Sequence, residues 1–152
     1  MKPIQEIEIS VAICERNGKI LLIQRKDIKN RQWDKQWEFP GGKIESLEKP
    51  LDTVIREVFE ETGLSVISAS FFLLHHHDWD LEQKILRVHI HCFHCMVGEG
   101  EVILETEKAY SSIWTPLAEA LDYESLLANK DILNYFLACN AIEHGLNSMN
   151  EL

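Results

Sequence analysis

The sequence predicts an α/β domain in which helices pack against a mixed β-sheet. Segments rich in β-branched and apolar residues recur along the chain between turn signals, as strands do. One intervening segment, from Pro50 to Gly63, instead places its apolar residues at helical spacing. The 152 residues are enough to bury a core in one unit, so we expect a single domain over residues 1–152.

The N-terminal part is expected to form a hairpin and then a loop. Ile4–Cys14 and Lys19–Arg25 carry β-branched and apolar residues on either side of the turn sequence Arg16-Asn17-Gly18. Residues 26–36 (KDIKNRQWDKQ) are polar and predict a loop. In the following WEFPGG, the proline and the paired glycines force a turn, and the glycines let the backbone approach a ligand closely.

A helix is predicted from near Pro50 to Gly63. Proline suits the first helical turn, and glycine suits a left-handed position after the last turn. The apolar residues at helical spacing predict one stripe packed on a core, and they are Leu51, Val54, Ile55, Val58 and Phe59. Strands are then expected at Val66–His76, Ile85–Val97 and Ser111–Pro116, with a last helix from Lys130 to about His144.

Composition and charge exclude several classes of function. A formal charge of −10 argues against a sequence-independent grip on nucleic acid or on an anionic membrane, because such a grip needs basic surface. The N-terminal MKPIQEIEIS has no long apolar core of a signal peptide, and no stretch is apolar enough to span a bilayer. The four cysteines are then expected to be reduced thiols, and the protein is expected to be cytoplasmic.

The predicted helix carries an acidic cluster that ordinary folding does not favour. Glu57, Glu60 and Glu61 are three or four residues apart, so their carboxylates lie on one face and repel one another. They also precede Gly63 in the last turn, where the helix dipole disfavours anions. A bound divalent cation would offset both costs. The alternative is a solvated helix face, which is the usual explanation of an acidic run.

The residues around this cluster resemble the Nudix box, G-x(5)-E-x(7)-R-E-U-x-E-E-x-G-U, in which U is a bulky aliphatic residue. Every fixed position is matched, by Gly42, Glu48, Arg56, Glu57, Val58, Glu60, Glu61, Gly63 and Leu64. The flanking Glu38–Glu45 segment resembles the MutT branch of that family. The resemblance implies a Nudix fold, in which a mixed sheet is sandwiched between helices as an α/β/α sandwich.

The resemblance also implies roles for the box residues. Glu57, Glu60 and Glu61 are expected to bind metal, and one of them or a nearby glutamate is expected to deprotonate the attacking water. Arg56 is expected to pair with Glu48 and so hold the loop onto the helix. Hard cations prefer carboxylate oxygens, so we expect Mg²⁺, with Mn²⁺ as a possible substitute. Together these five residues form the expected catalytic set.

Further contacts are expected outside the helix. The Gly41 carbonyl is expected near the metal and Lys43 near the phosphates. Related enzymes often recruit another acid from the loop before a strand that carries a tryptophan, here Trp114. Glu107 is nearest to that position, and Glu105 stays in contention because the spacing looks one residue longer than in MutT. The alternative is that both are ordinary surface acids.

Substrate choice must come from residues beyond the box. Asn129 occupies the place at which a MutT asparagine reads oxidised guanine, and an amide offers both a donor and an acceptor to a base edge. A helix N-cap is the competing role, because Asn129 stands just before the expected last helix. Arg25 and Phe39 match MutT positions near the nucleoside, with an ion pair or core packing as their alternatives.

These features predict a hydrolase that cleaves 8-oxo-dGTP to 8-oxo-dGMP and pyrophosphate, which would sanitise the nucleotide pool and avoid mutation. The alternatives are a Nudix hydrolase of another nucleotide, such as CTP, dCTP or ADP-ribose, and a nucleotide sensor without turnover. The expected partner is a small nucleotide, with neither stable nucleic acid binding nor membrane attachment, and the protein is expected to be a monomer or a homodimer.

Two segments suggest zinc but are discounted. In the predicted strand Ile85–Val97, Cys92 and Cys95 differ by an odd number and point to opposite faces, so they cannot share one metal. The run His75-His76-His77 also alternates faces, and we expect its members to be partly exposed strand residues, one of which could line the nucleotide pocket.

Overall fold

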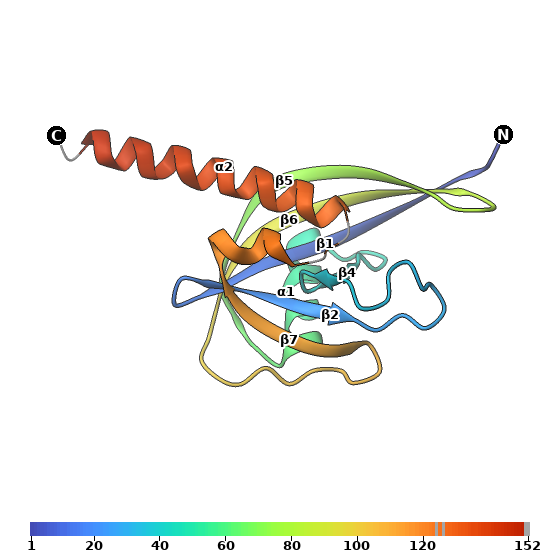
Figure 1. The fold of residues 1–152 in the computed structure, drawn as a ribbon, viewed down its shortest axis with the longest axis horizontal. Helices are drawn as coiled ribbons and strands as arrows, with labels where there is room; N and C mark the ends of the chain where they lie inside the picture. Colours follow the sequence, from blue (N-terminus) through green and yellow to red (C-terminus); the bar gives the residue numbers. More distant parts are fainter. Residues whose placement is uncertain (124, 126, 151–152) are drawn as a thin grey trace.

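The computed structural model describes residues 1–123, 125 and 127–150 (Figure 1). Its strands are β1 (Ile4–Arg16), β2 (Lys19–Arg25), β3 (Trp37–Glu38), β4 (Gly41–Lys43), β5 (Val66–Asp80), β6 (Ile85–Val97) and β7 (Ala109–Pro116). Its helices are α1 (Pro50–Thr62), the 3-10 helix η1 (Leu117–Asp122) and α2 (Leu127–Asn150).

The strands form one mixed sheet around the long strand β1. The main order is β3-β2-β1-β6-β5, with β4 paired to β1 and β7 paired to β2. The β1–β6 pair is parallel, whereas the other pairs are antiparallel. The predicted hairpin between β1 and β2 is confirmed, and Asn17 and Gly18 form its turn with φ angles of 53° and 75°.

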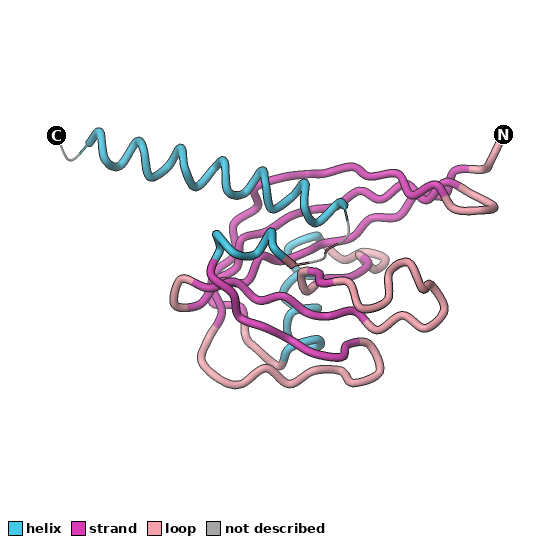
Figure 2. The backbone as a smooth tube through the Cα atoms, viewed as in Figure 1, coloured by secondary structure: helices cyan, strands magenta, loops and turns pink. Residues whose placement is uncertain are grey.

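Two hydrophobic cores lie on opposite faces of this sheet. One contains Ile13, Ile90 and Ile132 and lies beneath η1 and α2. The other contains Ala12, Val54 and Phe93 and lies beneath α1. Figure 2 shows the sheet with α1 on one side and the other two helices on the opposite side, so the predicted sandwich is confirmed.

The apolar stripe predicted for α1 is partly wrong. Val54 and Val58 are fully buried, but Leu51, Ile55 and Phe59 are 43%, 42% and 60% exposed. The buried face also includes two threonines, Thr53 and Thr62. Apolar spacing predicted the helix correctly, but only the part of the apolar arc at Val54 and Val58 packs against the sheet, beside Ala12 and Phe93.

Several element ends differ from the sequence prediction. Strand β5 continues to Asp80 because its residues stay paired with β6 as far as Asp80 opposite Ile85. Helix α2 begins at Leu127 rather than at Lys130, and η1 was not predicted. Strand pairing and helix docking are long-range contacts, and local residue pattern does not report them.

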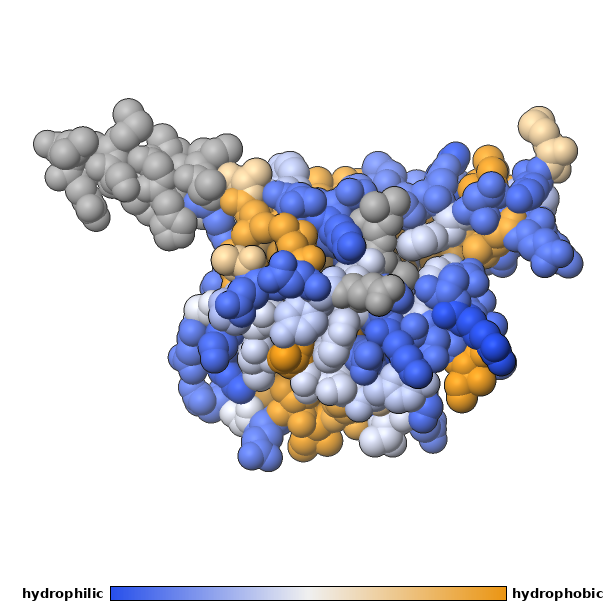
Figure 3. Space-filling model, in the orientation of Figure 1, coloured by the Kyte–Doolittle hydropathy of each residue, from blue (hydrophilic) through white to orange (hydrophobic). Residues whose placement is uncertain are grey.

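Two smaller observations concern the thiols and the surface. Cys92 and Cys95 lie in different cores, which confirms that they point to opposite faces of β6, and all four cysteines are free. Polar residues cover much of the face seen in Figure 3, and the apolar residues form separate patches there. No helix in the described part of the chain is long and apolar enough to cross a membrane.

Candidate active site

The acidic end of α1 lies against the backbone of β4. The Gly41 amide donates a hydrogen bond to Glu61 Oε2 over 3.1 Å. A Cβ atom placed on Gly42 would lie 2.5 Å from the carboxyl carbon of Glu57, so a side chain there would displace the Glu57 carboxylate from this position. Gly63, with a φ of 74°, ends α1, and its amide donates to the Phe59 carbonyl. Glu57 and Glu61 are therefore half-buried, whereas Glu60 is exposed.

Arg56 links the loop before α1 to the acidic face of the helix. Its Nε and Nη2 donate to the two oxygens of Glu48 over 2.7 and 2.9 Å, and Nη1 donates to Glu57 over 2.8 Å and to Glu60 over 3.1 Å. Thr53 Oγ1 donates to Glu48 over 2.6 Å. These hydrogen bonds, first of all those from Arg56, lower the pKa of Glu48 to about 2. Glu48 is thus a permanent anion that orients Arg56.

The loop joining these residues carries backbone strain at Leu47. Leu47 has a φ of 67°, a conformation that favours glycine, and its side chain is fully exposed. Next to it, Glu48 accepts a hydrogen bond from the Glu45 amide over 3.2 Å. The turn is therefore fixed by the contacts of Glu48, and not by the residue type at position 47.

A cavity of about 190 Å³ opens beside Glu61. Its lining residues are Ile23, Arg25, Lys26, Glu38, Gly41, Glu61, Glu105, Lys108 and Ala109. Burial first of all, with the charges of Glu57, Glu38 and Glu105, raises the pKa of Glu61 to about 9, against the lowering effect of the Gly41 amide. Burial also raises the pKa of Glu38, against the lowering effect of Arg25. The cavity thus gathers carboxylates whose ionised forms are destabilised unless a cation joins them.

The donor set fits a hard divalent cation. It consists of carboxylate oxygens beside backbone groups of Gly41, and Mg²⁺ prefers such oxygen ligands. Glu105 Oε1 is buried without a hydrogen-bond partner in the described part of the chain, which leaves an oxygen available to a ligand. Glu107 is exposed and does not line the cavity, so Glu105 is the acid of this loop that faces Glu61.

A second cavity of about 290 Å³ adjoins the first and shares Arg25, Glu38 and Gly41 with it. Its apolar floor comes from β1 and β6, and its lining residues are Ile7, Ile9, Val11, Arg25, Trp33, Glu38, Phe39, Gly41, Gly42, Lys43, Trp79, Leu86, Val88, Ile90, Ala128 and Asn129. This combination of apolar surface and a few polar groups is typical of a small-molecule site.

The residues expected near a nucleoside meet at this second cavity. Asn129 lies within the first turns of α2, so it is not the N-cap, and its Nδ2 donates to the Trp37 carbonyl over 3.5 Å. Phe39 is buried and Lys43 is exposed at the rim. Arg25 pairs with Asp27 over 2.8 Å and with Glu38 over 3.3 Å, which confirms its alternative role in ion pairing.

Sequence reasoning missed Trp33, Trp79 and Glu38. The rings of Trp33 and Trp79 meet edge to face with centroids 5.7 Å apart, and both residues line the second cavity. A large aromatic residue inside a polar segment, as in RQWDKQ and HDWDLE, was the available signal. The carboxylate of Glu38 directly precedes the Phe-Pro-Gly-Gly turn, which could have drawn attention to it.

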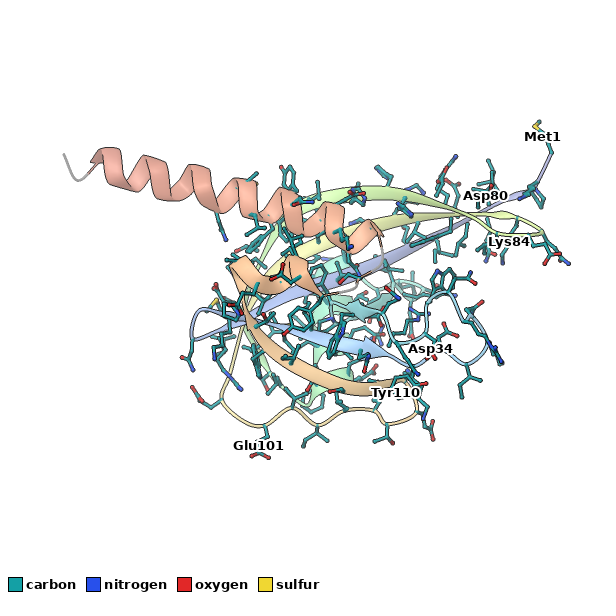
Figure 4. All side chains as sticks on the ribbon, viewed as in Figure 1. Met1, Asp34, Asp80, Lys84, Glu101 and Tyr110 are labelled. Carbon is teal, nitrogen blue, oxygen red and sulfur yellow. The ribbon has the colours of Figure 1, made fainter. Side chains whose placement is uncertain are left out.

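The loop at residues 26–36 contacts β7 through a side-chain hydrogen bond. Figure 4 labels Asp34 and Tyr110, which lie near each other, and the Tyr110 hydroxyl donates to Asp34 over 3.4 Å. The Arg25 guanidinium also lies 5.4 Å from the centre of the Trp33 ring. Glu101, another acid of the loop before β7, lies at the outer edge in Figure 4 and is exposed.

The α/β/α sandwich and the arginine-linked carboxylates beside a glycine turn together define a class of hydrolase that acts on phosphoric anhydrides. The model of the NUDIX domain family matches residues 5–136. This chain belongs to the Nudix family and is a MutT-like hydrolase of nucleotide phosphoric anhydrides, as the box predicted. Hydrolases of this family generally use a divalent metal.

Individual relatives agree with this assignment. The chain is 33% identical over 137 residues to a CTP pyrophosphohydrolase of Escherichia coli (strain K12), covering 89% of this chain and 94% of that protein. An 8-oxo-dGTP diphosphatase of Proteus vulgaris is 34% identical over 67 residues, 44% of this chain and 58% of that protein. The crystal structure of a MutT protein from Methanosarcina mazei Go1 matches with a TM-score of 0.72 and 27% identity, over 91% of this chain and 96% of the other.

Proposed function

We propose that this protein is a Mg²⁺-dependent nucleoside triphosphate pyrophosphohydrolase, with Mn²⁺ as a possible substitute, that releases a nucleoside monophosphate and pyrophosphate. The observation that carries this proposal is the shared wall between the two cavities. Gly41, Glu38 and Arg25 line both, so a nucleoside in the larger cavity would have its phosphates beside Glu61 and Glu105.

The protein groups divide the work by their positions. A bound divalent cation would neutralise diphosphate charge and acidify a water molecule. Glu57 and Glu61 would hold it, with Glu60 at the exposed edge, and Arg56 would keep the Glu57 carboxylate in place. Glu105 is our candidate for the proton acceptor, because its unpartnered Oε1 belongs to the same cavity as Glu61. Lys43 stands at the rim as a phosphate contact.

The first candidate substrate is 8-oxo-dGTP. Asn129 lines the larger cavity, and its amide can present both an acceptor and a donor to a base edge. Guanine offers only an acceptor at N7, whereas the oxidised base carries an N–H there, so an amide oxygen can separate the two. This substrate would make the enzyme a sanitiser of the nucleotide pool.

The second candidate substrate is CTP or dCTP. It is favoured by the E. coli CTP pyrophosphohydrolase, whose similarity covers 94% of that protein, whereas the P. vulgaris relative is matched over 58%. Cytosine also presents N–H donors, at N4, that an amide oxygen could accept. The two candidates therefore use the same residue and differ in base size.

A substrate panel tests the proposal. We would measure pyrophosphate and phosphate release with Mg²⁺ on 8-oxo-dGTP, dGTP and CTP, and AMP formation from ADP-ribose, for the natural chain and for Asn129→Ala. We expect kcat/KM for 8-oxo-dGTP to exceed that for dGTP, and Asn129→Ala to reduce this preference by about tenfold, or about 1.4 kcal/mol. A preference for CTP would select the second candidate. Phosphate without pyrophosphate, or no turnover of any nucleotide, would contradict the proposed reaction.

The proposal also covers the domain organisation, the cellular compartment and the oligomeric state of the enzyme. We propose that residues 1–152 form one Nudix domain that acts in the cytoplasm as a monomer or a homodimer. The free thiols of Cys14, Cys92 and Cys95 support a reducing compartment. Size-exclusion chromatography with light scattering would distinguish the two oligomeric states.

A further inference from the structure

A second cluster of metal-ligating side chains lies outside the carboxylate site. His75 and His77 are two residues apart in β5, so they project from the same face of the strand. Asp131 approaches them from α2. One potential ligand atom from each residue lies within 4.8 Å of the other two, and His75 Nε2 lies 3.8 Å from Asp131 Oδ2.

The contacts of this cluster are incomplete without a ligand. A distance of 3.8 Å is too long for a hydrogen bond between His75 and Asp131. His75 Nε2 is nevertheless buried, and it has no hydrogen-bond partner in the described part of the chain. A buried polar nitrogen without a partner requires an explanation, because leaving it unsatisfied costs folding free energy.

The chemistry of the donors selects the ligand. Two imidazoles and one carboxylate are the ligands of Zn²⁺ and similar transition metals, whereas Mg²⁺ prefers oxygen ligands alone. The His77 ring is supported edge to face by Trp79, at 4.4 Å between centroids, and the His75 and His77 rings are roughly parallel, at 24°. Rings held in this way need little reordering to bind one ion.

We propose that His75, His77 and Asp131 form a binding site for a divalent transition metal of the Zn²⁺ type, which joins the first turns of α2 to β5. The site is separate from the carboxylate cluster on α1, and the proposal does not depend on which nucleotide is cleaved. Three protein ligands leave a further coordination position for water.

Chain neighbours of the three proposed ligands line the larger cavity from two elements. Ala128 and Asn129 line that cavity and lie in the same turns of α2 as Asp131. Trp79 lines it from β5, on the same face of the strand as His77. A metal at this position would therefore fix two walls of the cavity relative to each other. From the sequence alone, zinc was discounted at this histidine run, because the third ligand, Asp131, comes from a distant segment.

The test is a binding experiment on the full chain without a histidine tag. The metal-free protein is held in excess Mg²⁺, so that the carboxylates are occupied, and is titrated with Zn²⁺ by calorimetry and with Co²⁺ by visible absorption. We expect one equivalent to bind. His75→Ala, His77→Ala and Asp131→Asn should each weaken binding by more than about tenfold, with loss of the Co²⁺ absorption bands.

His76→Ala is the matched control. His76 is the neighbour of both proposed ligands but points to the opposite face, where its Nδ1 lies 2.6 Å from His89 Nδ1. It should leave Zn²⁺ affinity unchanged. Equal weakening by His76→Ala, or loss of the Zn²⁺ equivalent in Glu61→Gln, would overturn the proposal. Thermal unfolding of the metal-free variants identifies any that fail to fold, and Asp131→Asn, which keeps the side-chain shape, then decides the result.

Discussion

The cavity beside Glu61, here called the carboxylate cavity, shares a wall with the larger cavity that we propose for the nucleoside, here called the nucleoside cavity. The two cavities are built in opposite ways. Beside the first, the acidic residues Glu57, Glu60 and Glu61 lie together on α1, and Arg56 pairs with Glu57, Glu60 and the neighbouring Glu48. The wall of that cavity adds Arg25, Glu38 and Glu105 from other segments. The second has an apolar floor from β1 and β6, and its polar groups come from segments far apart in the chain. Most residues proposed for bond cleavage therefore come from one helix and its adjoining loop, whereas the residues proposed for base recognition come from distant segments of the chain.

The largest expected effect comes from the carboxylates of α1. Glu57→Gln and Glu61→Gln keep the side-chain shape but remove a charged metal ligand. We expect kcat to fall by roughly a thousandfold, or about 4 kcal/mol of activation free energy, on every nucleotide. Steady-state kinetics with Mg²⁺ tests this, with circular dichroism as the folding control. Full activity in both variants would show that bond cleavage does not depend on this region.

The next effect separates two acids of one loop. Glu105→Gln should lower kcat by about a hundredfold, because its carboxylate shares the cavity with Glu61 and is our candidate proton acceptor. Glu107→Gln is the matched control and should leave kcat unchanged, since Glu107 is exposed. A reversed order of the two variants would contradict the role proposed for Glu105 and point to Glu107 as the acid of this loop that acts in the reaction.

A smaller effect is expected from the nucleoside cavity. Trp79→Ala removes an aromatic wall that also contacts Trp33, so we expect KM to rise by about tenfold for all bases while kcat stays nearly constant. Phe71→Ala, on the same strand but exposed and outside this cavity, is a control of similar size change. A fall in kcat that equals the rise in KM would mean that the two cavities are not independent.

The smallest effect is on stability without metal. The pKa of Glu61 is raised from 4.5 to about 9, so the folded state favours the protonated carboxyl group. Its contribution to stability is complete below pH 4.5 and is lost as the pH rises toward 9. In chelator at pH 8, Glu61→Gln should therefore be more stable than the natural chain by about 1 kcal/mol. Urea unfolding at pH 5 and pH 8 measures this, and a gain at pH 5 of the same size would refute the mechanism.

Prediction from sequence was strongest where one element carries the whole signal. The hairpin at Asn17-Gly18 and the ends of α1 followed from turn and capping residues, and the Nudix box identified the family. Prediction was weaker for the acid in the loop before β7, because a difference of one residue in spacing left both Glu105 and Glu107 open. A loop has no fixed period, so only its path in space tells which side chain faces the cavity.

The sequence by itself determined the chemistry of this protein, because Glu48, Arg56, Glu57 and Glu61 lie on one helix and its adjoining loop, and helix geometry fixes which of them share a face. Only the tertiary structure decided what surrounds that chemistry. Trp33, Trp79 and Asn129 meet at one cavity, and Asp131 meets His75, through strand pairing and helix docking between distant segments. Such contacts depend on the packing of the whole chain, which no local pattern of residues contains.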